Sequence, residues 1–249
     1  MIKYYTRACN FYYGKTSLEK VKKKLSIPLH GNKLISFDTI EIISRTNTKR
    51  ISIKKIDRLN SAIKKKILLN IKKISKKKYF KGLNFSELPI LMGVLNLTPN
   101  SFSDGGKYIK NRLGEKHAKK LINDGCGILD IGGEATNPGS KEIPFKIEWK
   151  RIYPTLKKIK KFKKFLSLDT RKSEVMKMGI KNKINLINDV SGLEHDPYTV
   201  EVLKKTNIPF VIHHMQGNPM TMQKNPKYKN VLLDIYDFFD EKIKYLRLN

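Results

Sequence analysis

Polar side chains end five successive apolar segments in the C-terminal two thirds of the chain. The segments are short, and stretches of helical pattern separate them, which predicts parallel strands joined by crossover helices. The polar residues at their ends are Asn96, Asp130, Asp169, Asn188 with Asp189, and His213 with His214. In a βα barrel the site is built at the carboxyl ends of the strands. An open doubly wound sheet gathers ligand groups only around a switch point, so five polar strand ends favour one convergent barrel site.

Three of these strand ends continue into loops rich in glycine, at 96–106, 132–139 and 213–219. Such loops can close over a substrate and supply hydroxyl and amide donors to phosphate oxygens. Glycine, proline and asparagine are also ordinary turn residues. The loops taken alone therefore leave two interpretations open, a phosphate-binding site and plain turns.

The elements that must position these residues begin near Leu88 and Pro89. Strands are expected at 90–95, 127–131, 165–169, 184–189 and 209–214, and helices at 111–124, 144–162, 172–180, 197–206 and 228–247. The predicted class is α/β, of the (β/α)8 TIM-barrel type. Only about five of the eight units fit into the 249 residues. The chain divides into an N-terminal basic extension, 1–88, and an incomplete barrel domain, 89–249.

The N-terminal extension shows no recognisable chemistry. Between Lys49 and Lys81 the only acidic residue is Asp57, and four isoleucines at three- or four-residue spacing would share one helical face. These are Ile63, Ile67, Ile71 and Ile74. One hypothesis is a basic amphipathic helix for RNA or a membrane surface. The other, which we favour, is a packed helix with solvated lysines.

The formal net charge of +30 is extreme. It is compatible with nucleic acid, an anionic membrane or an anionic substrate as partner. We favour compositional drift, because the excess is mostly lysine spread along the chain. Cys9 and Cys126 form no disulfide framework or metal spacing, and no apolar run approaches the roughly 18 residues of a membrane span. A soluble cytoplasmic protein is expected.

Five sequence blocks carry a family resemblance, in the expected order and spacing. MGVLNLTPNSFSDGG (92–106) resembles the first signature of the dihydropteroate synthases. The later blocks are LDIGGEATNPGS (129–140), SLDTRKSEV (167–175), NLINDVSGL (185–193) and HMQGNPMTMQ (214–223). The resemblance implies a transferase of folate biosynthesis that joins para-aminobenzoate to a dihydropterin hydroxymethyl pyrophosphate. The products would be dihydropteroate and pyrophosphate, and Mg2+ would be the cofactor.

The same resemblance implies roles for single residues. Asp130, Asp169 and Asn188 match pterin contacts, where carboxylates and an amide can pair with the alternating donors and acceptors of a pterin edge. Asn96 matches the residue associated with Mg2+, and an amide oxygen suits that ion. The loop positions implied for pyrophosphate are Thr136, Asn137 and His214, and those for the para-aminobenzoate pocket are Phe102 and Pro138. No side chain is expected to act as nucleophile or base, because such chemistry depends on positioning and electrostatics.

Two departures from the family pattern stand out. Asn137 stands where the family has an arginine, and loss of a charge-assisted contact costs roughly 1.5–3 kcal/mol. The blocks that the family carries on its sixth to eighth strands are missing from these 249 residues. The chain is therefore interpreted as a truncated product, as one of two polypeptides, or as a catalytically inactive pterin-binding remnant. Its activity alone is left open.

The expected partners are small molecules, the dihydropterin pyrophosphate and para-aminobenzoate. Neither a membrane nor nucleic acid is the favoured partner. The alternative from another class is a basic RNA-binding protein acting through residues 49–81. A related methyltransferase barrel is disfavoured by the TPNSFSDGG loop. The resemblance implies a homodimer for full-length members of the family.

Overall fold

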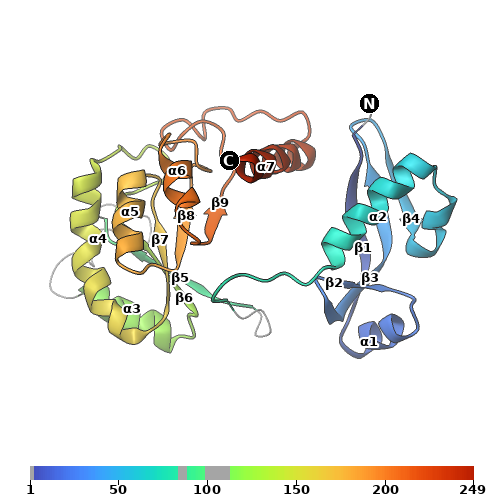
Figure 1. The fold of residues 1–249 in the computed structure, drawn as a ribbon, viewed down its shortest axis with the longest axis horizontal. Helices are drawn as coiled ribbons and strands as arrows, with labels where there is room; N and C mark the ends of the chain where they lie inside the picture. Colours follow the sequence, from blue (N-terminus) through green and yellow to red (C-terminus); the bar gives the residue numbers. More distant parts are fainter. Residues whose placement is uncertain (1–2, 84–88, 99–112) are drawn as a thin grey trace. The chain divides into compact units, whose positions relative to one another are not determined.

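The computed structural model describes residues 3–83, 89–98 and 113–249. The chain separates into two compact units, Met1–Tyr79 and Phe80–Asn249 (Figure 1). Each unit has its own hydrophobic core.

The C-terminal unit is built on a parallel sheet of five strands in sequential order. The strands are β5 (Met92–Asn96), β6 (Ile128–Gly132), β7 (Phe165–Asp169), β8 (Leu186–Asp189) and β9 (Phe210–Ile212). All five strands and their order were predicted, with ends that differ by at most two residues. The α/β class is therefore confirmed.

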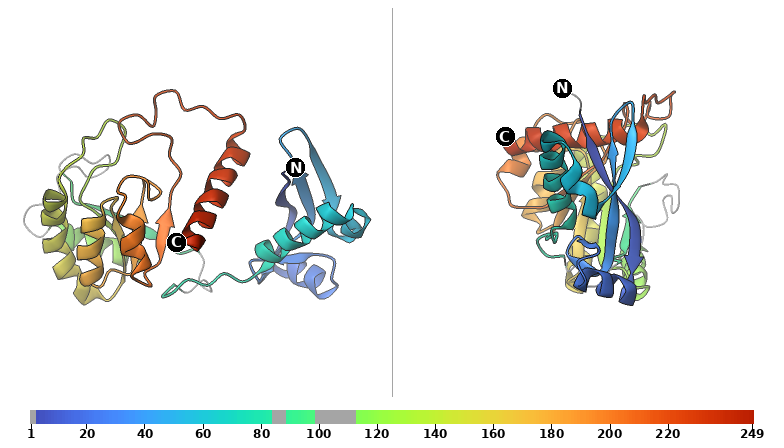
Figure 2. Two further views of the ribbon diagram at one scale, coloured as in Figure 1. Left: turned by 45° about the horizontal axis from the view of Figure 1, so that its top comes forward. Right: turned by 90° about the vertical axis from the view of Figure 1, so that its right-hand side faces the viewer.

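Helices connect the strands and cover one face of the sheet. They are α3 (Leu113–Asn123), α4 (Phe145–Ile159), α5 (Ser173–Lys181) and α6 (Thr199–Lys204), followed by α7 (Val231–Leu248) after the last strand. Crossover connections between parallel strands are right-handed, so strands added in one direction place successive helices on the same face. Figures 1 and 2 show α3 to α6 as a layer along the sheet. The opposite face carries the polar strand-end residues Asn96, Asp169 and Asn188.

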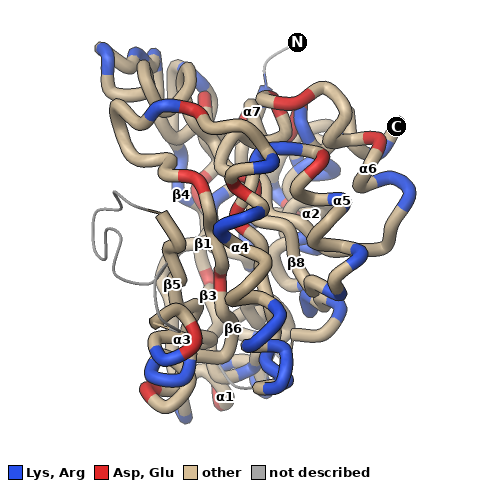
Figure 3. The backbone as a smooth tube through the Cα atoms, turned by 90° about the vertical axis from the view of Figure 1, so that its left-hand side faces the viewer, with Lys and Arg blue, Asp and Glu red and all other residues tan. Residues whose placement is uncertain are grey.

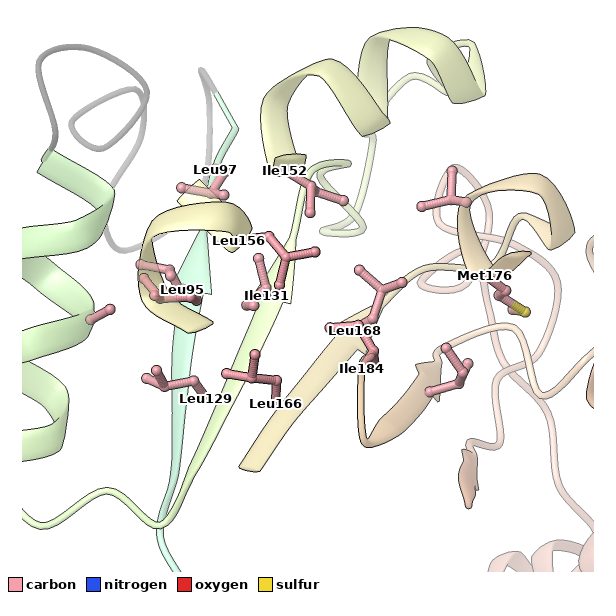
Figure 4. Packing of buried hydrophobic residues seen from close by; sticks show 14 of the residues in the cluster. Leu95, Leu97, Leu129, Ile131, Ile152, Leu156, Leu166, Leu168, Met176 and Ile184 are labelled. Atoms are coloured by element: carbon pink, nitrogen blue, oxygen red, sulfur yellow. The ribbon is translucent and has the colours of Figure 1, made fainter. Parts of the chain in front are cut away.

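The core lies between this helical layer and the sheet (Figure 4). Alternate residues of the strands, among them Leu129, Ile131 and Leu168, are fully buried against Ile152 and Leu156 of α4. The helices approach the sheet closely. A Cβ on Gly179 of α5 would lie 2.3 Å from the Leu168 side chain, so a larger residue would have to displace this buried leucine.

The sheet is open within the described residues. There β5 pairs only with β6, and β9 pairs only with β8. The arrangement is that of five consecutive units of a (β/α)8 barrel. The inner face of β5 is correspondingly uncovered, with Val94 half exposed.

The N-terminal unit is an antiparallel sheet with helices, which sequence analysis did not predict. Its strands are β1 (Tyr5–Tyr13), β2 (Ile27–Leu29), β3 (Asn32–Ile43) and β4 (Thr48–Ser52), and its helices are α1 (Gly14–Lys22), η1 (Ile53–Arg58) and α2 (Ser61–Ser75). The central strand β3 pairs with the other three. The missed signal was the run of aromatic and β-branched residues in β1 and β3, which favours strands.

The helix expected in the basic stretch is α2. Asn60 caps its first turn by accepting a hydrogen bond from the Ala62 N–H at 3.0 Å. Ile67 and Ile71 are buried in the core of their own unit, and Ile63 and Ile74 pack beside them. Lysines and arginines, coloured alike, are spread along the backbone tube in Figure 3. None of the helices that the structure describes is long and apolar enough to cross a membrane.

Candidate active site

The inner face of the parallel sheet carries one row of aligned residues. Asn96 of β5 aligns with Gly132 of β6, Gly132 with Asp169 of β7, and Asp169 with Asn188 of β8. Aligned residues of neighbouring parallel strands point to the same face. The fold thus brings together three residues that the sequence singled out from three separate strands.

Gly132 leaves the space into which two of these side chains point. A Cβ at this position would lie 3.3 Å from Asp169 Oδ2 and 3.7 Å from Asn96 Oδ1. The two oxygen atoms therefore converge over the glycine. Any larger residue would occupy the room between them.

Asp130 lies two residues before Gly132 on the same strand and therefore on the same face. Asn188 Nδ2 donates a hydrogen bond to Asp130 Oδ2 at 2.9 Å. His213, directly after β9, donates from Nε2 to Asn188 Oδ1 at 2.7 Å. The three side chains form a continuous hydrogen-bonded row across β6, β8 and the end of β9.

The two aspartates of this face, Asp130 and Asp169, have raised pKa values. Asp130 is 5% exposed and its Oδ1 atom is buried without a hydrogen-bond partner. Burial raises the pKa of Asp130, and the nearby Ser167 hydroxyl and then the Asn188 amide partly offset this effect. Burial, together with the nearby Asp130 carboxylate, raises the pKa of Asp169 well above its ordinary value. An unpartnered buried acceptor is costly, so Asp130 Oδ1 is suited to accept a hydrogen bond from an N–H group.

Asp189 follows Asn188 but points to the other face. Its carboxylate accepts hydrogen bonds from the Ser191 N–H at 2.8 Å and the Leu193 N–H at 3.1 Å. It also accepts one from the Ser191 hydroxyl at 2.6 Å. Asp189 therefore shapes the turn after β8. Of the two polar residues at this strand end, Asn188 belongs to the candidate site.

The glycine-framed loop after β6 carries Thr136, Asn137 and Pro138, all half-buried. Asn137, where an arginine was expected, accepts a hydrogen bond from the Ser140 hydroxyl at 2.7 Å. The Gly139 N–H donates to the Pro219 carbonyl at 3.1 Å. This bond joins the loop after β6 to the loop after β9, so the two glycine-rich segments meet.

A buried ionic cluster anchors the same loop. Glu134, 6% exposed, receives Lys172 Nζ at 2.6 Å and Arg171 Nε at 2.8 Å, both from the segment after β7. Lys172 Nζ also lies 2.8 Å from Glu148 of α4, whose side chain is fully buried. Burial raises the pKa of Glu134, but hydrogen bonds from Arg171, Lys172 and the Ile143 N–H lower it overall. At Glu148 burial has the larger effect, and the pKa is raised.

The cluster extends to the loop after β8. Arg171 donates from a guanidinium nitrogen to His195 Nδ1 at 3.2 Å. The His195 Nε2–H group in turn donates to Glu142 at 3.1 Å. Loops after three successive strands are thereby tied together. Sequence analysis gave none of these cluster residues a role.

Sequence analysis named His213 among the polar strand ends but assigned a specific role only to His214, and strand alternation could have told the two histidines apart. Asn188 aligns with Val211, and His213 lies two positions further along, on the same side. His214, to which the sequence assigned a pyrophosphate role, lies among aromatic rings. Its ring is 4.6 Å from that of Phe238 in α7, and its Nε2 is hydrogen bonded with the Tyr228 hydroxyl at 3.0 Å.

Two predicted roles concern the para-aminobenzoate pocket and the metal ion. Phe102 lies outside the described residues, so its assignment to a para-aminobenzoate pocket stays a prediction. For the metal, the described residues hold no cluster of three or more His, Cys, Asp or Glu side chains. Asn96 and Asp169 nevertheless direct one oxygen each to the same space. The amide oxygen of Asn96 suits Mg2+, which keeps several waters and phosphate oxygens around one or two protein ligands, whereas the raised pKa of Asp169 favours its protonated form.

Relatives of known function resemble the C-terminal unit. A dihydropteroate synthase of Escherichia coli K12 is 41% identical over 156 residues, which are 62% of this chain and 55% of that protein. One from Clostridium beijerinckii is 38% identical over 66% of this chain and 58% of its own length. The chain thus spans little more than half the length of these relatives.

Solved structures agree with the sequence relatives. A Yersinia pestis dihydropteroate synthase in complex with a sulfonamide drug matches with a TM-score of 0.64 at 36% identity, covering 69% of this chain and 62% of that one. The Burkholderia cenocepacia enzyme, complexed with 7,8-dihydropteroate, matches with a TM-score of 0.56 at 31% identity. It covers 66% of this chain and 55% of its own.

The family model described as pterin binding enzyme matches residues 92–248. That span includes every strand of the parallel sheet and all the aligned polar residues of its inner face. The chain therefore belongs to the family of pterin-binding enzymes.

Proposed function

We propose that this chain carries the pterin-binding part of a dihydropteroate synthase. The reaction would join para-aminobenzoate to dihydropterin hydroxymethyl pyrophosphate and release pyrophosphate. The observation that carries the proposal is the hydrogen-bonded row of Asp130 and Asn188 beside the buried Asp169. The names of the relatives, and the 7,8-dihydropteroate bound in one solved structure, support the same reaction.

In this proposal the row binds the pterin edge. Asp130 Oδ1, buried and without a partner, would accept a hydrogen bond from a ligand N–H group. Asp169, with its raised pKa, can keep a proton and donate it to a ligand acceptor. Together the residues orient the pterin so that its methylene carbon lies toward the loops, and positioning is the main contribution of the protein.

The loops would receive the other two groups. Thr136 and Asn137, held by the Glu134 cluster, are proposed to contact the pyrophosphate with His214, and Pro138 with Phe102 to border the para-aminobenzoate. Asn96 would hold Mg2+ through its amide oxygen. Bound there, Mg2+ would neutralise charge on the departing pyrophosphate.

Binding by the full chain tests the proposal first. We expect dihydropterin hydroxymethyl pyrophosphate with Mg2+ to raise the temperature of unfolding, because a ligand that binds only the folded state stabilises it. No shift at saturating ligand would overturn the proposed site. Formation of dihydropteroate from both substrates then separates an active chain from a catalytically inactive pterin-binding fragment.

An RNA-binding role for residues 49–81 predicts a different result. RNA affinity would fall steeply with salt and would be lost with the N-terminal unit, while the pterin response remained. The free thiols Cys9 and Cys126 support a proposed cytoplasmic location. A homodimer remains a proposal for full-length members of the family.

A further inference from the structure

His213 contacts the candidate site through Asn188 and has no counterpart in the roles that sequence analysis assigned. We propose that His213 is a positioning residue that fixes the side-chain amide of Asn188 in the orientation needed to bind a pterin. The inference rests on the proposed function of the site as a pterin site. It concerns one imidazole, whose Nε2 lies 2.7 Å from Asn188 Oδ1.

The amide of Asn188 has two chemically different ends, and each end has one partner. Its Nδ2 donates to Asp130 Oδ2 at 2.9 Å, and its Oδ1 faces His213 Nε2. An amide oxygen can only accept a hydrogen bond. Nε2 of His213 must therefore carry a proton and donate it.

Asp130 alone fixes this orientation weakly. An ionised carboxylate accepts only from the amide nitrogen, but a protonated carboxyl can donate to the amide oxygen just as well. Burial raises the pKa of Asp130, so its protonated form costs less than it does in water. A reversed Asn188 amide would then still find a partner in Asp130. It would, however, turn its own N–H groups toward His213, and the imidazole disfavours this state as long as Nε2 carries the proton.

The orientation of the Asn188 amide decides which hydrogen-bonding groups the site offers to a ligand. Asp130 Oδ1 is an unpartnered acceptor, and the second hydrogen on Asn188 Nδ2 is a donor beside it. Held in this order, the pair matches a heterocycle edge with an N–H next to an acceptor atom. Preorganised polar groups bind more tightly because no orientation is lost on binding.

His214 cannot take over this task, because it lies on the other side of the strand end. Its ring packs on Phe238 and its Nε2 is engaged with Tyr228. The two adjacent histidines are thus chemically identical but differently placed. Substitution of His213 alone isolates the contact with Asn188.

The first test compares two variants of the full chain, with 6-hydroxymethylpterin as the probe and its fluorescence as the readout. We expect His213→Leu, which lacks a donor, to bind roughly tenfold more weakly. His213→Gln, whose amide N–H can reach the same oxygen, should recover most of the affinity, and a purely structural role would not show this rescue. The exposed His30→Gln is the matched control. Thermal unfolding shows whether each variant is folded.

The second test needs no ligand. Ring 15N spectra of the chain, which has five histidines, are assigned with His213→Gln. We expect a protonated Nε2 on His213, with a resonance that moves in Asn188→Ala. A bare Nε2 at neutral pH would overturn the inference, even if His213→Leu fails to fold.

The outcomes separate the inference from the proposed function. A wild-type chain that binds no pterin overturns the proposed function, and the binding role of His213 with it. Wild-type binding together with unchanged affinity in His213→Leu overturns the His213 inference alone. Weakened binding in His213→Leu without recovery in His213→Gln also counts against it, because packing rather than a donor would then be the cause.

Discussion

Lys172 Nζ lies 2.6 Å from Glu134 Oε1, although the two residues come from loops that follow different strands. The pair is buried, and Lys172 is shared with Glu148 of α4 at 2.8 Å. Removing one partner of such a pair leaves an uncompensated charge in a low dielectric. The loop that carries Thr136 is therefore held by ionic contacts as well as by its glycines.

Replacing Lys172 by methionine should destabilise the protein strongly. Lys172→Met keeps the aliphatic length but leaves the Glu134 and Glu148 carboxylates without this cation. We expect a loss of about 3–5 kcal/mol in the free energy of unfolding, measured by denaturant titration. Lys205→Met, which breaks an exposed pair with Glu201 on α6, is the matched control and should change stability little. Equal effects of the two substitutions would contradict the importance of the buried cluster.

Asp169→Asn should stabilise the chain in a pH-dependent way. Burial and the neighbouring Asp130 charge raise the pKa of Asp169 in the folded state. The folded chain therefore holds this proton more tightly, and stability from this group is lost as pH rises above the ordinary Asp pKa of about 4. The asparagine variant escapes this loss. Its advantage over wild type should grow as pH rises above about 4 in denaturant titrations, and a constant difference would refute the assignment.

Asp130→Asn should weaken pterin binding while preserving the fold. The amide keeps the shape of the carboxylate but removes the charge that strengthens hydrogen bonds from a ligand. We expect an affinity for 6-hydroxymethylpterin about tenfold to a hundredfold lower, measured by fluorescence titration. Asp124→Asn, at an exposed pair with Lys120, should bind as wild type. If both variants bind equally well, Asp130 does not contact the pterin.

Two adjacent glycines should respond differently to alanine. In Gly132→Ala the new Cβ would lie 3.3 Å from Asp169 Oδ2, so the substitution intrudes on the candidate site and should mainly lower pterin affinity. In Gly133→Ala it would lie 2.7 Å from the Glu148 carbonyl oxygen. Backbone yields less readily than a side chain, so we expect a stability loss of about 1–3 kcal/mol. Thermal unfolding and pterin titration on both variants check this contrast, and it fails if Gly132→Ala is the less stable of the two.

Sequence reasoning placed the parallel strands because their apolar runs and polar ends follow the chain locally. Asp130, Asp169 and Asn188 were found for that reason, and the sheet register then brings them together. The cluster of Glu134, Lys172 and Glu148 could not be predicted, because it depends on where three separate segments meet.

The role of His213 and the sheet of the N-terminal unit were not predicted, for reasons that lie in the sequence near each of them. The family resemblance drew attention to His214, whereas strand alternation points to its neighbour His213. In the N-terminal unit, sequence analysis considered only the lysine-rich stretch 49–81 and overlooked the apolar residues of β3. Its buried residues Phe37, Ile40 and Ile42 form a core with Ile67 of α2.

Because two histidines follow one another at the end of β9, deletion and insertion of one residue in this strand should have different effects on the contact with Asn188. Side chains alternate between faces, so a one-residue shift exchanges the two environments. Deleting a residue earlier in β9 would bring His214 to the position beside Asn188 and keep an imidazole there. Inserting a residue would bring Ile212 to that position and leave the amide oxygen of Asn188 without its donor. Natural variation in this segment should therefore accept shortening more readily than lengthening.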